Sequence, residues 1–248
     1  MGRAIVATLA PLPDIAITWV DTAPDRFPAA LPEGIGCQRC HGPGALHAGL
    51  ALAGRAGADE LRLAIVNPAR LPPPRREDVC RQCHLQPSVA LPGPRRLGRA
   101  DYSFRPGEAL SDYQVVIDVA EQGEDADERF EINHHPYRLD QSACRTDDGR
   151  PLSCLLCHDP HRRVPPGERS RHYRQVCLGC HAETPTSSVH GADDRSDCTS
   201  CHMPRRRTRD VVHAVMTDHR ITRLPVGPEA VARRVEQDPV IADARVLD

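Results

Sequence analysis

Five copies of the motif C-x-x-C-H constrain the fold of this chain more than any other feature. The copies are Cys37-Cys40-His41, Cys80-Cys83-His84, Cys154-Cys157-His158, Cys177-Cys180-His181 and Cys198-Cys201-His202, and they use ten of the eleven cysteines. This motif is typical of c-type haem attachment, in which both thiols form thioethers to the haem and the histidine becomes the proximal iron ligand. Two cysteines three residues apart span about one helical turn, so both sulfurs reach one edge of the macrocycle. We therefore predict five covalently bound haem c groups.

Three other uses of these cysteines fit the sequence less well. Zinc takes four ligands, drawn from two half-sites, and five half-sites cannot form even pairs. A redox dithiol of the thioredoxin kind would occur once, beside a βαβ pattern. Disulfides would not require a histidine after every pair. Haem attachment is therefore the favoured interpretation.

The composition is poor in large residues that could fill a core. The 248 residues include three Phe, four Tyr and one Trp, together with 24 Pro and 17 Gly. Each aromatic side chain buries about 150–250 Å², and frequent Pro and Gly interrupt regular elements. We predict a mainly α fold with much irregular structure, in which short helices and long loops surround a core packed with haems.

Residue patterns predict two helices, one strand and one loop. An amphipathic helix is expected near 58–66 and a strand at 113–120. The acidic run 121–131 is expected to be a solvated loop. In the tail, 228–237 is expected to be a short helix with Pro228 near its start.

The distribution of motifs suggests three parts of the chain. Residues 1–33 form a haem-free N-terminal segment, 34–225 a haem domain and 226–248 a C-terminal tail. Within the haem domain, a haem-free insert at 101–150 separates two motifs from the other three. We expect the two groups of haems to share one core.

Eight histidines remain as distal ligand candidates once the proximal ones are assigned. They are His47, His134, His135, His161, His172, His190, His213 and His219. A distal ligand must come from a distant part of the chain, because the motif itself already lies on the other face of its haem. Mostly bis-His ligation is expected, which gives lower potentials than Met/His ligation. Met216 is an alternative ligand, and Cys144, the odd cysteine, is expected to be a small buried group.

Between residues 34 and 225 the chain resembles a family of bacterial multihaem cytochromes c, whose members often carry tetratricopeptide repeats. The resemblance rests on "IGCQRCHGPGALH", "IVNPARLPPPRREDVCRQCHLQ", "FRPGEALSDY", "LSCLLCHDPH", "HYRQVCLGCH" and "CTSCHMPRRRTRDVVHAVMTDHRI". It implies that the distal ligands are His47, His135, His161, His213 and His219. It favours His135 over His134, keeps His190 in reserve, and places His172 where the family more often has an aromatic residue.

The chain departs from this family at both ends. Family members usually begin with a signal peptide and at least one further CxxCH motif, and many continue into a repeat array. No clear signal peptide is recognised in the N-terminal residues. Compared with the family, we expect an N-terminally truncated chain without the repeats.

Function follows from the expected haems. Closely spaced haems form an electron relay, so redox proteins are the expected partners and no small-molecule substrate is expected. Covalent haem attachment takes place outside the cytoplasm, which places the protein in the periplasm or another extracytoplasmic location. The alternative is a multihaem oxidoreductase that acts on a small nitrogen or sulfur compound at one haem with an open distal position, but no attachment motif is altered in a way that marks such a haem.

Charge and hydropathy exclude other classes of function. The formal net charge is −2 and all 32 basic residues are Arg. No basic block with interleaved aromatic residues is present, so nucleic-acid binding is not expected. No apolar run reaches the roughly 18 residues of a membrane helix, so membrane association is not indicated.

Overall fold

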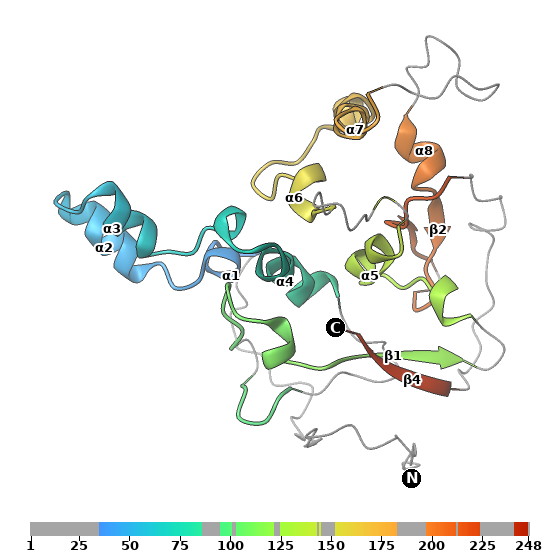
Figure 1. The fold of residues 1–248 in the computed structure, drawn as a ribbon, viewed down its shortest axis with the longest axis horizontal. Helices are drawn as coiled ribbons and strands as arrows, with labels where there is room; N and C mark the ends of the chain where they lie inside the picture. The colour runs from blue at the N-terminus through green and yellow to red at the C-terminus, as the bar shows by residue number, and fades with distance from the viewer. Residues whose placement is uncertain are drawn as a thin grey trace. The chain divides into compact units, whose positions relative to one another are not determined.

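The structure is a computed structural model that describes residues 35–85, 95–100, 103–121, 125–142, 144, 152–182, 197–211, 213–223 and 241–247. Its contacts divide the chain into two compact units. The first contains Met1–Gln82, Pro87–Asp127 and Pro239–Asp248, and the second contains Cys83–Gln86 and Glu128–Asp238. In the described residues most regular structure is helical, as expected, and strands are few (Figure 1).

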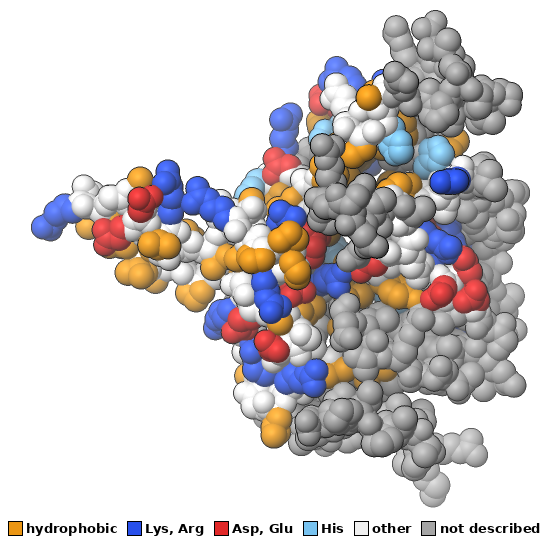
Figure 2. Space-filling model, in the orientation of Figure 1, with side chains coloured by type: hydrophobic (Ala, Val, Ile, Leu, Met, Phe, Trp, Pro, Cys, Tyr) orange, Lys and Arg blue, Asp and Glu red, His pale blue; other side chains and the backbone are white. Residues whose placement is uncertain are grey.

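The first unit holds the helices before the first strand. They are α1 (Gln38–His41), α2 (Ala45–Ala53), α3 (Ala58–Leu63), η1 (Pro68–Arg70), α4 (Pro73–His84, whose last two residues belong to the second unit) and η2 (Leu110–Asp112). Gly54 ends α2 in the left-handed region, at φ 66°. The helix expected near 58–66 is present as the shorter α3. No residue of α2 or α3 is buried, and Figure 2 shows hydrophobic side chains along the surface of this helical pair.

The strand expected at 113–120 is confirmed and has an unforeseen partner. It is β1 (Val116–Glu121), which pairs antiparallel with β4 (Ile241–Leu247) from Val116 opposite Leu247 onward. No strand was predicted from the sequence at the position of β4. The segments 1–33 and 228–237 lie outside the described residues, so the helix expected in the tail stays a prediction.

The described apolar core of the first unit comes largely from the predicted haem-free insert. Phe104, Leu110 and Tyr113 form a buried cluster, and the two aromatic ring centroids lie 5.9 Å apart. The Asp78 carboxylate of α4 accepts a hydrogen bond from the Leu110 backbone N–H at 3.1 Å. The Arg95 guanidinium carbon lies 4.9 Å from the Tyr113 ring centre. The part of the insert that belongs to the first unit therefore contacts α4.

The second unit consists of short helices and one hairpin. Its elements are α5 (His135–Asp140), α6 (Cys154–Cys157), η4 (Pro166–Glu168), α7 (Arg169–Leu178), α8 (Cys198–His202), β2 (Arg205–Arg207) and β3 (Val215–Thr217). Of η3 (Ala126–Glu128), only Glu128 belongs to this unit. β2 and β3 pair antiparallel, with Arg206 opposite Met216. Helix α7 packs against both α6 and α8, which brings three C-x-x-C-H motifs together.

The interior of the second unit is mostly polar. Its described buried hydrophobic residues are Leu85 and Phe130, whereas its buried polar ones are Arg129, Glu131, His134, Arg138, Ser142, Ser153, Thr208 and Asp218. Such groups avoid a large desolvation cost only when they are hydrogen-bonded or paired. This part of the chain is therefore organised by polar contacts among its buried residues.

The prediction of a solvated loop at 121–131 is partly wrong. Asp125 is exposed as expected, but Arg129, Phe130 and Glu131 are buried. The Arg129 guanidinium donates to Glu131 Oε1 at 2.7 Å, and this ion pair satisfies charges that water would otherwise solvate. Sequence pattern could not identify the pair, because both residues look like members of a charge run.

In the described residues no helix is long and apolar enough to cross a bilayer.

Truncation of Phe104 tests the core of the first unit. We expect Phe104→Ala to lower the free energy of unfolding of the holoprotein by about 3–5 kcal/mol, because it removes a buried ring and leaves a cavity. Leu52→Ala is the control, since Leu52 is 90% exposed, and it should change stability by less than about 0.5 kcal/mol. Urea unfolding followed by circular dichroism measures both, and equal effects would contradict the described core.

Candidate haem-binding site

Each C-x-x-C-H motif lies on or beside a single helical turn. The motifs occupy α1, the end of α4, α6 with His158 directly after it, the end of α7 with the following turn, and α8. The backbone N–H of the motif histidine bonds to the carbonyl of the first cysteine in His41, His158 and His181, at 2.9–3.0 Å. The histidine thus follows its first cysteine by one turn, as thioether attachment beside a proximal ligand requires.

The motif cysteines are reduced thiols that differ in exposure. In the part of the chain that the structure describes, no two cysteines form a disulfide. Cys37, Cys180 and Cys201 are exposed and the other motif cysteines are half-buried. Burial, helped by neighbouring Cys198, raises the pKa of Cys177 to about 11, so this thiol is protonated at neutral pH. Burial also raises the pKa of Cys157.

Two predicted proximal histidines are oriented by backbone carbonyls far along the chain. The His41 Nδ1–H donates to the Val66 carbonyl at 2.7 Å, and the His202 Nδ1–H donates to the Thr222 carbonyl at 2.6 Å. A hydrogen bond at Nδ1 fixes the ring orientation and leaves the Nε2 lone pair for a metal. These residues therefore fit the haem that the motif implies.

Two of the predicted distal ligands have the same arrangement. The His47 Nδ1 lies 2.9 Å from the Leu61 carbonyl oxygen, and the His219 Nδ1 lies 3.2 Å from the Thr217 carbonyl oxygen. A carbonyl can only accept, so Nδ1 carries the hydrogen and Nε2 has the lone pair. Both rings present the nitrogen that would bind iron.

Four predicted iron ligands of the second unit form a cluster of imidazoles. His84 and His158 are predicted proximal ligands, and His135 and His219 are predicted distal ligands. Ring centroids are 5.5 Å apart for His84 and His135, 4.5 Å for His135 and His219, and 6.2 Å for His158 and His219. We call these four residues the imidazole cluster. The structure thus brings two proximal and two distal candidates together from four separate segments.

Burial favours the neutral form of three members of the imidazole cluster. Burial, together with the neighbouring histidines, lowers the pKa of His135 to about 4. Burial and His158 lower the pKa of His219 to about 4. Burial and His84 also lower the pKa of His158. Neutral imidazole is the form that coordinates metals, so burial favours the protonation state that iron binding needs.

The remaining distal candidates are distributed differently. His161 and His213 lie at the surface, the former with its side chain 75% exposed and its Nδ1 3.6 Å from Asp159. His190 lies outside the described residues. His172 directs Nε2 toward the Cys157 carbonyl at 3.3 Å, which occupies the nitrogen expected to bind iron. The assignments of all five distal candidates as iron ligands, His47, His135, His161, His213 and His219, stay predictions.

His134 and His135 have different surroundings although they are neighbours. The His134 side chain is 1% exposed, and its Nε2 lies 3.2 Å from Glu131 Oε2. Arg129 binds the same carboxylate through Oε1. His134 therefore belongs to a buried polar group, whereas His135 belongs to the imidazole cluster.

Sequence reasoning missed the polar residues that hold the cluster. Arg138 and Asp218 form a buried ion pair, with Nη2 and Oδ2 2.7 Å apart. Ser142 contacts the backbone on either side of Arg220. Asp218 occurs in a stretch quoted for the family resemblance, but nothing in the sequence indicates that it meets Arg138 and Ser142.

The role of His134 is tested by its removal. We expect His134→Ala to lower the free energy of unfolding by about 1–3 kcal/mol, because the buried Glu131 carboxylate loses a partner. The same variant should leave every iron in its original spin state, since the His134 Nε2 lies beside Glu131 and His134 is not part of the imidazole cluster. Denaturant unfolding and ferric EPR spectra measure the two effects. A new high-spin signal would contradict this assignment.

Comparison with known proteins identifies two of the five motifs, those that begin at Cys154 and Cys177. Residues 147–186 match the family model described as doubled CXXCH motif, and this match includes the motifs at Cys154 and Cys177. No curated protein and no solved structure was found to match. Proteins with c-type haem usually work outside the cytoplasm. The match supports a cytochrome c family, and the CXXCH motifs indicate covalent binding of c-type haem.

Proposed function

We propose that the chain carries five covalent haem c groups, mostly with bis-His ligation, and transfers electrons between redox partner proteins. The observation that carries this proposal is the imidazole cluster. Two predicted proximal and two predicted distal ligands lie within ring contact of one another, although His84 and His219 are far apart in the sequence. A fold that gathers imidazoles from distant segments of the chain fits iron ligands on neighbouring haems.

The number five rests on the local geometry of the motifs. The family match covers two motifs, and the other three have the same Cys-Cys-His spacing on α1, α4 and α8. His41 and His202 add the hydrogen bond at Nδ1 that orients a proximal ligand. One attachment chemistry therefore accounts for all ten motif cysteines.

Haem binding also explains how the second unit buries apolar surface. Its described interior has few hydrophobic side chains, and Leu156 within the motif on α6 is exposed. A haem macrocycle is a large apolar surface held covalently beside its motif. Burying it would supply about 25 cal/mol for each Å² of apolar area removed from water.

Electron transfer is favoured over catalysis by the supply of ligands. All five attachment motifs end in histidine, and the chain has eight further histidines, enough to close every iron. Iron with two histidine ligands has no open position for a substrate, and its potential is lower than that of Met/His iron. The expected partners are redox proteins outside the cytoplasm.

Haem counting by mass tests the cofactor part of the proposal. The mature protein from a host that attaches haem c is expected to show five porphyrin additions, and each Cys→Ser double variant of one motif should lose one addition. Cys144→Ser is the matched control, because Cys144 belongs to no motif, and it should keep all five. A motif whose removal leaves the mass increment unchanged would contradict haem attachment there.

Ferric EPR tests the ligation and the function. Bis-His iron is low-spin, so we expect five low-spin haems and no response to nitrite, hydroxylamine or sulfite. Reduction should produce a sharp visible α-band, and the electrons should pass on to a second cytochrome c. A high-spin signal that shifts with one of these compounds would instead support a multihaem oxidoreductase.

A further inference from the structure

A polar clamp joins two segments that carry members of the imidazole cluster. Arg138 of α5 donates from Nε to Asp218 Oδ1 at 2.9 Å and from Nη2 to Asp218 Oδ2 at 2.7 Å. The two side chains are 1% and 3% exposed. Such a two-point contact fixes direction as well as distance. Arg138 lies three residues after His135, and Asp218 directly precedes His219, so the pair joins the backbones that carry both histidines.

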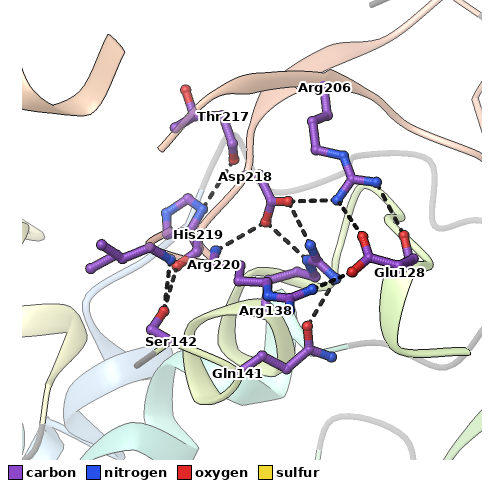
Figure 3. A network of polar contacts seen from close by, with 10 residues as sticks. Glu128, Arg138, Gln141, Ser142, Arg206, Thr217, Asp218, His219 and Arg220 are labelled. Carbon is purple, nitrogen blue, oxygen red and sulfur yellow. Dashed lines mark hydrogen bonds and ion pairs between the residues drawn. The ribbon is translucent and has the colours of Figure 1, made fainter. Parts of the chain in front are cut away.

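The Asp218 carboxylate is saturated by other donors. Its Oδ1 accepts the Arg220 backbone N–H at 3.0 Å, and its Oδ2 accepts from Arg206 Nη1 of β2, also at 3.0 Å (Figure 3). Arg206 also pairs with Glu128. The Asp218 side chain thus connects the turn after β3 to α5 and β2. Because His219 is the next residue, these contacts also restrict the position of the His219 backbone.

Ser142 fixes the backbone of His219 from the other side. Its hydroxyl donates to the His219 carbonyl at 3.2 Å and accepts from the Ile221 N–H at 2.8 Å. The ring itself is oriented through Nδ1, which lies 3.2 Å from the Thr217 carbonyl oxygen. Figure 3 shows the His219 imidazole joined to Thr217, and Ser142 in contact with the backbone that follows the ring. The nitrogen that this arrangement leaves for a metal is Nε2.

Ring spacing favours His158 as the proximal partner of His219. The centroids of His158 and His219 are 6.2 Å apart with planes inclined by 32°. An iron held between two imidazole rings lies about 2 Å from one nitrogen of each ring. The distance between the two ring centroids is then these two metal–nitrogen distances plus the distance from each nitrogen to the centre of its own ring. This sum is close to the separation of His158 and His219. His135 and His219 are 4.5 Å apart and nearly perpendicular, which is too close for an iron between them.

We propose that His219 is the distal iron ligand of the haem attached to Cys154 and Cys157, opposite His158, and that Arg138, Asp218 and Ser142 are the positioning residues that hold it there. This assignment rests on the proposed haem binding. It goes further by pairing one distal histidine with one motif and by giving the buried ion pair a role in ligation. The positioning residues act through the backbone of His219 and do not touch the iron.

The pairing is tested in the full-length holoprotein. His219→Gly should retain five porphyrins by mass, while one of the five irons becomes high-spin in quantitative EPR. Added imidazole should occupy the vacated position and restore the low-spin signal. Five low-spin irons in the variant without added imidazole would overturn the pairing, and a wild-type mass without five porphyrins would instead refute the proposed function.

Removal of single haems identifies the affected iron. In a Cys154→Ser/Cys157→Ser background, His219→Gly should give four haems and no high-spin signal, because the iron that lost its ligand is absent. In a Cys177→Ser/Cys180→Ser background the high-spin signal should persist. The opposite pattern would assign His219 to another haem and overturn the proposal.

A ligand-retaining variant covers the case in which His219→Gly does not accumulate with five haems. His219→Met keeps an axial ligand but changes its type, and Met/His iron has a higher potential than bis-His iron. One of five reduction potentials should therefore rise, and this shifted potential should disappear in the Cys154→Ser/Cys157→Ser background. Five unshifted potentials would contradict the pairing.

The clamp is tested by a change that keeps the shape of the carboxylate. Asp218→Asn removes the charge that both arginines bind, so the g-values of the His219-ligated haem should shift while the haem count stays at five. Asp59→Asn is the control, since Asp59 forms an exposed pair with Arg62, and it should leave the spectrum unchanged. A loss of stability in Asp218→Asn without any change in g-values would show a merely structural ion pair and refute the positioning role.

Discussion

The buried ion pair between Arg138 and Asp218 is the contact on which the second unit most depends. It joins residues 80 positions apart and connects a helix to a hairpin. Burial alone would raise the pKa of Asp218, but the hydrogen bonds and charge of Arg138, with further donors from Arg220 and Arg206, outweigh it and lower the pKa. The carboxylate is therefore ionised. A buried charge of this kind is tolerable only because its oxygens are fully hydrogen-bonded.

The two units bury different kinds of side chain in their interiors. The first buries Phe104, Leu110 and Tyr113 in an apolar cluster that would suit any small domain. The second buries mainly charged and polar side chains, which supply little hydrophobic stabilisation of their own. The second unit also contains most of the cysteine–histidine motifs. Its polar interior is understandable if the haems provide the apolar surface and the polar network supplies fixed directions for the ligands.

Sequence reasoning succeeded where function depends on local geometry. The Cys-Cys-His spacing indicates one helical turn, and such turns are present at α1, α6 and α8. The strand β1 was predicted from its residue pattern, and α3 was predicted with a longer extent. The burial of Arg129 and Glu131 was missed, because a charge run carries no sign of which members will pair. The partner strand β4 was missed because a hairpin signal requires neighbouring segments, and β4 lies more than a hundred residues after β1.

The sequence by itself determined which residues can attach haem, because thioether chemistry needs two thiols and a histidine within one turn of chain. It also supplied a set of candidate distal ligands, of which His135 and His219 lie in the imidazole cluster. Only the tertiary structure decided which histidines meet, which ring nitrogens are held by carbonyls, and that Asp218 and Ser142 fix the backbone of His219. The physical reason is that a distal ligand approaches its iron from a distant segment, and the contacts that bring two distant segments together leave no periodic mark in either.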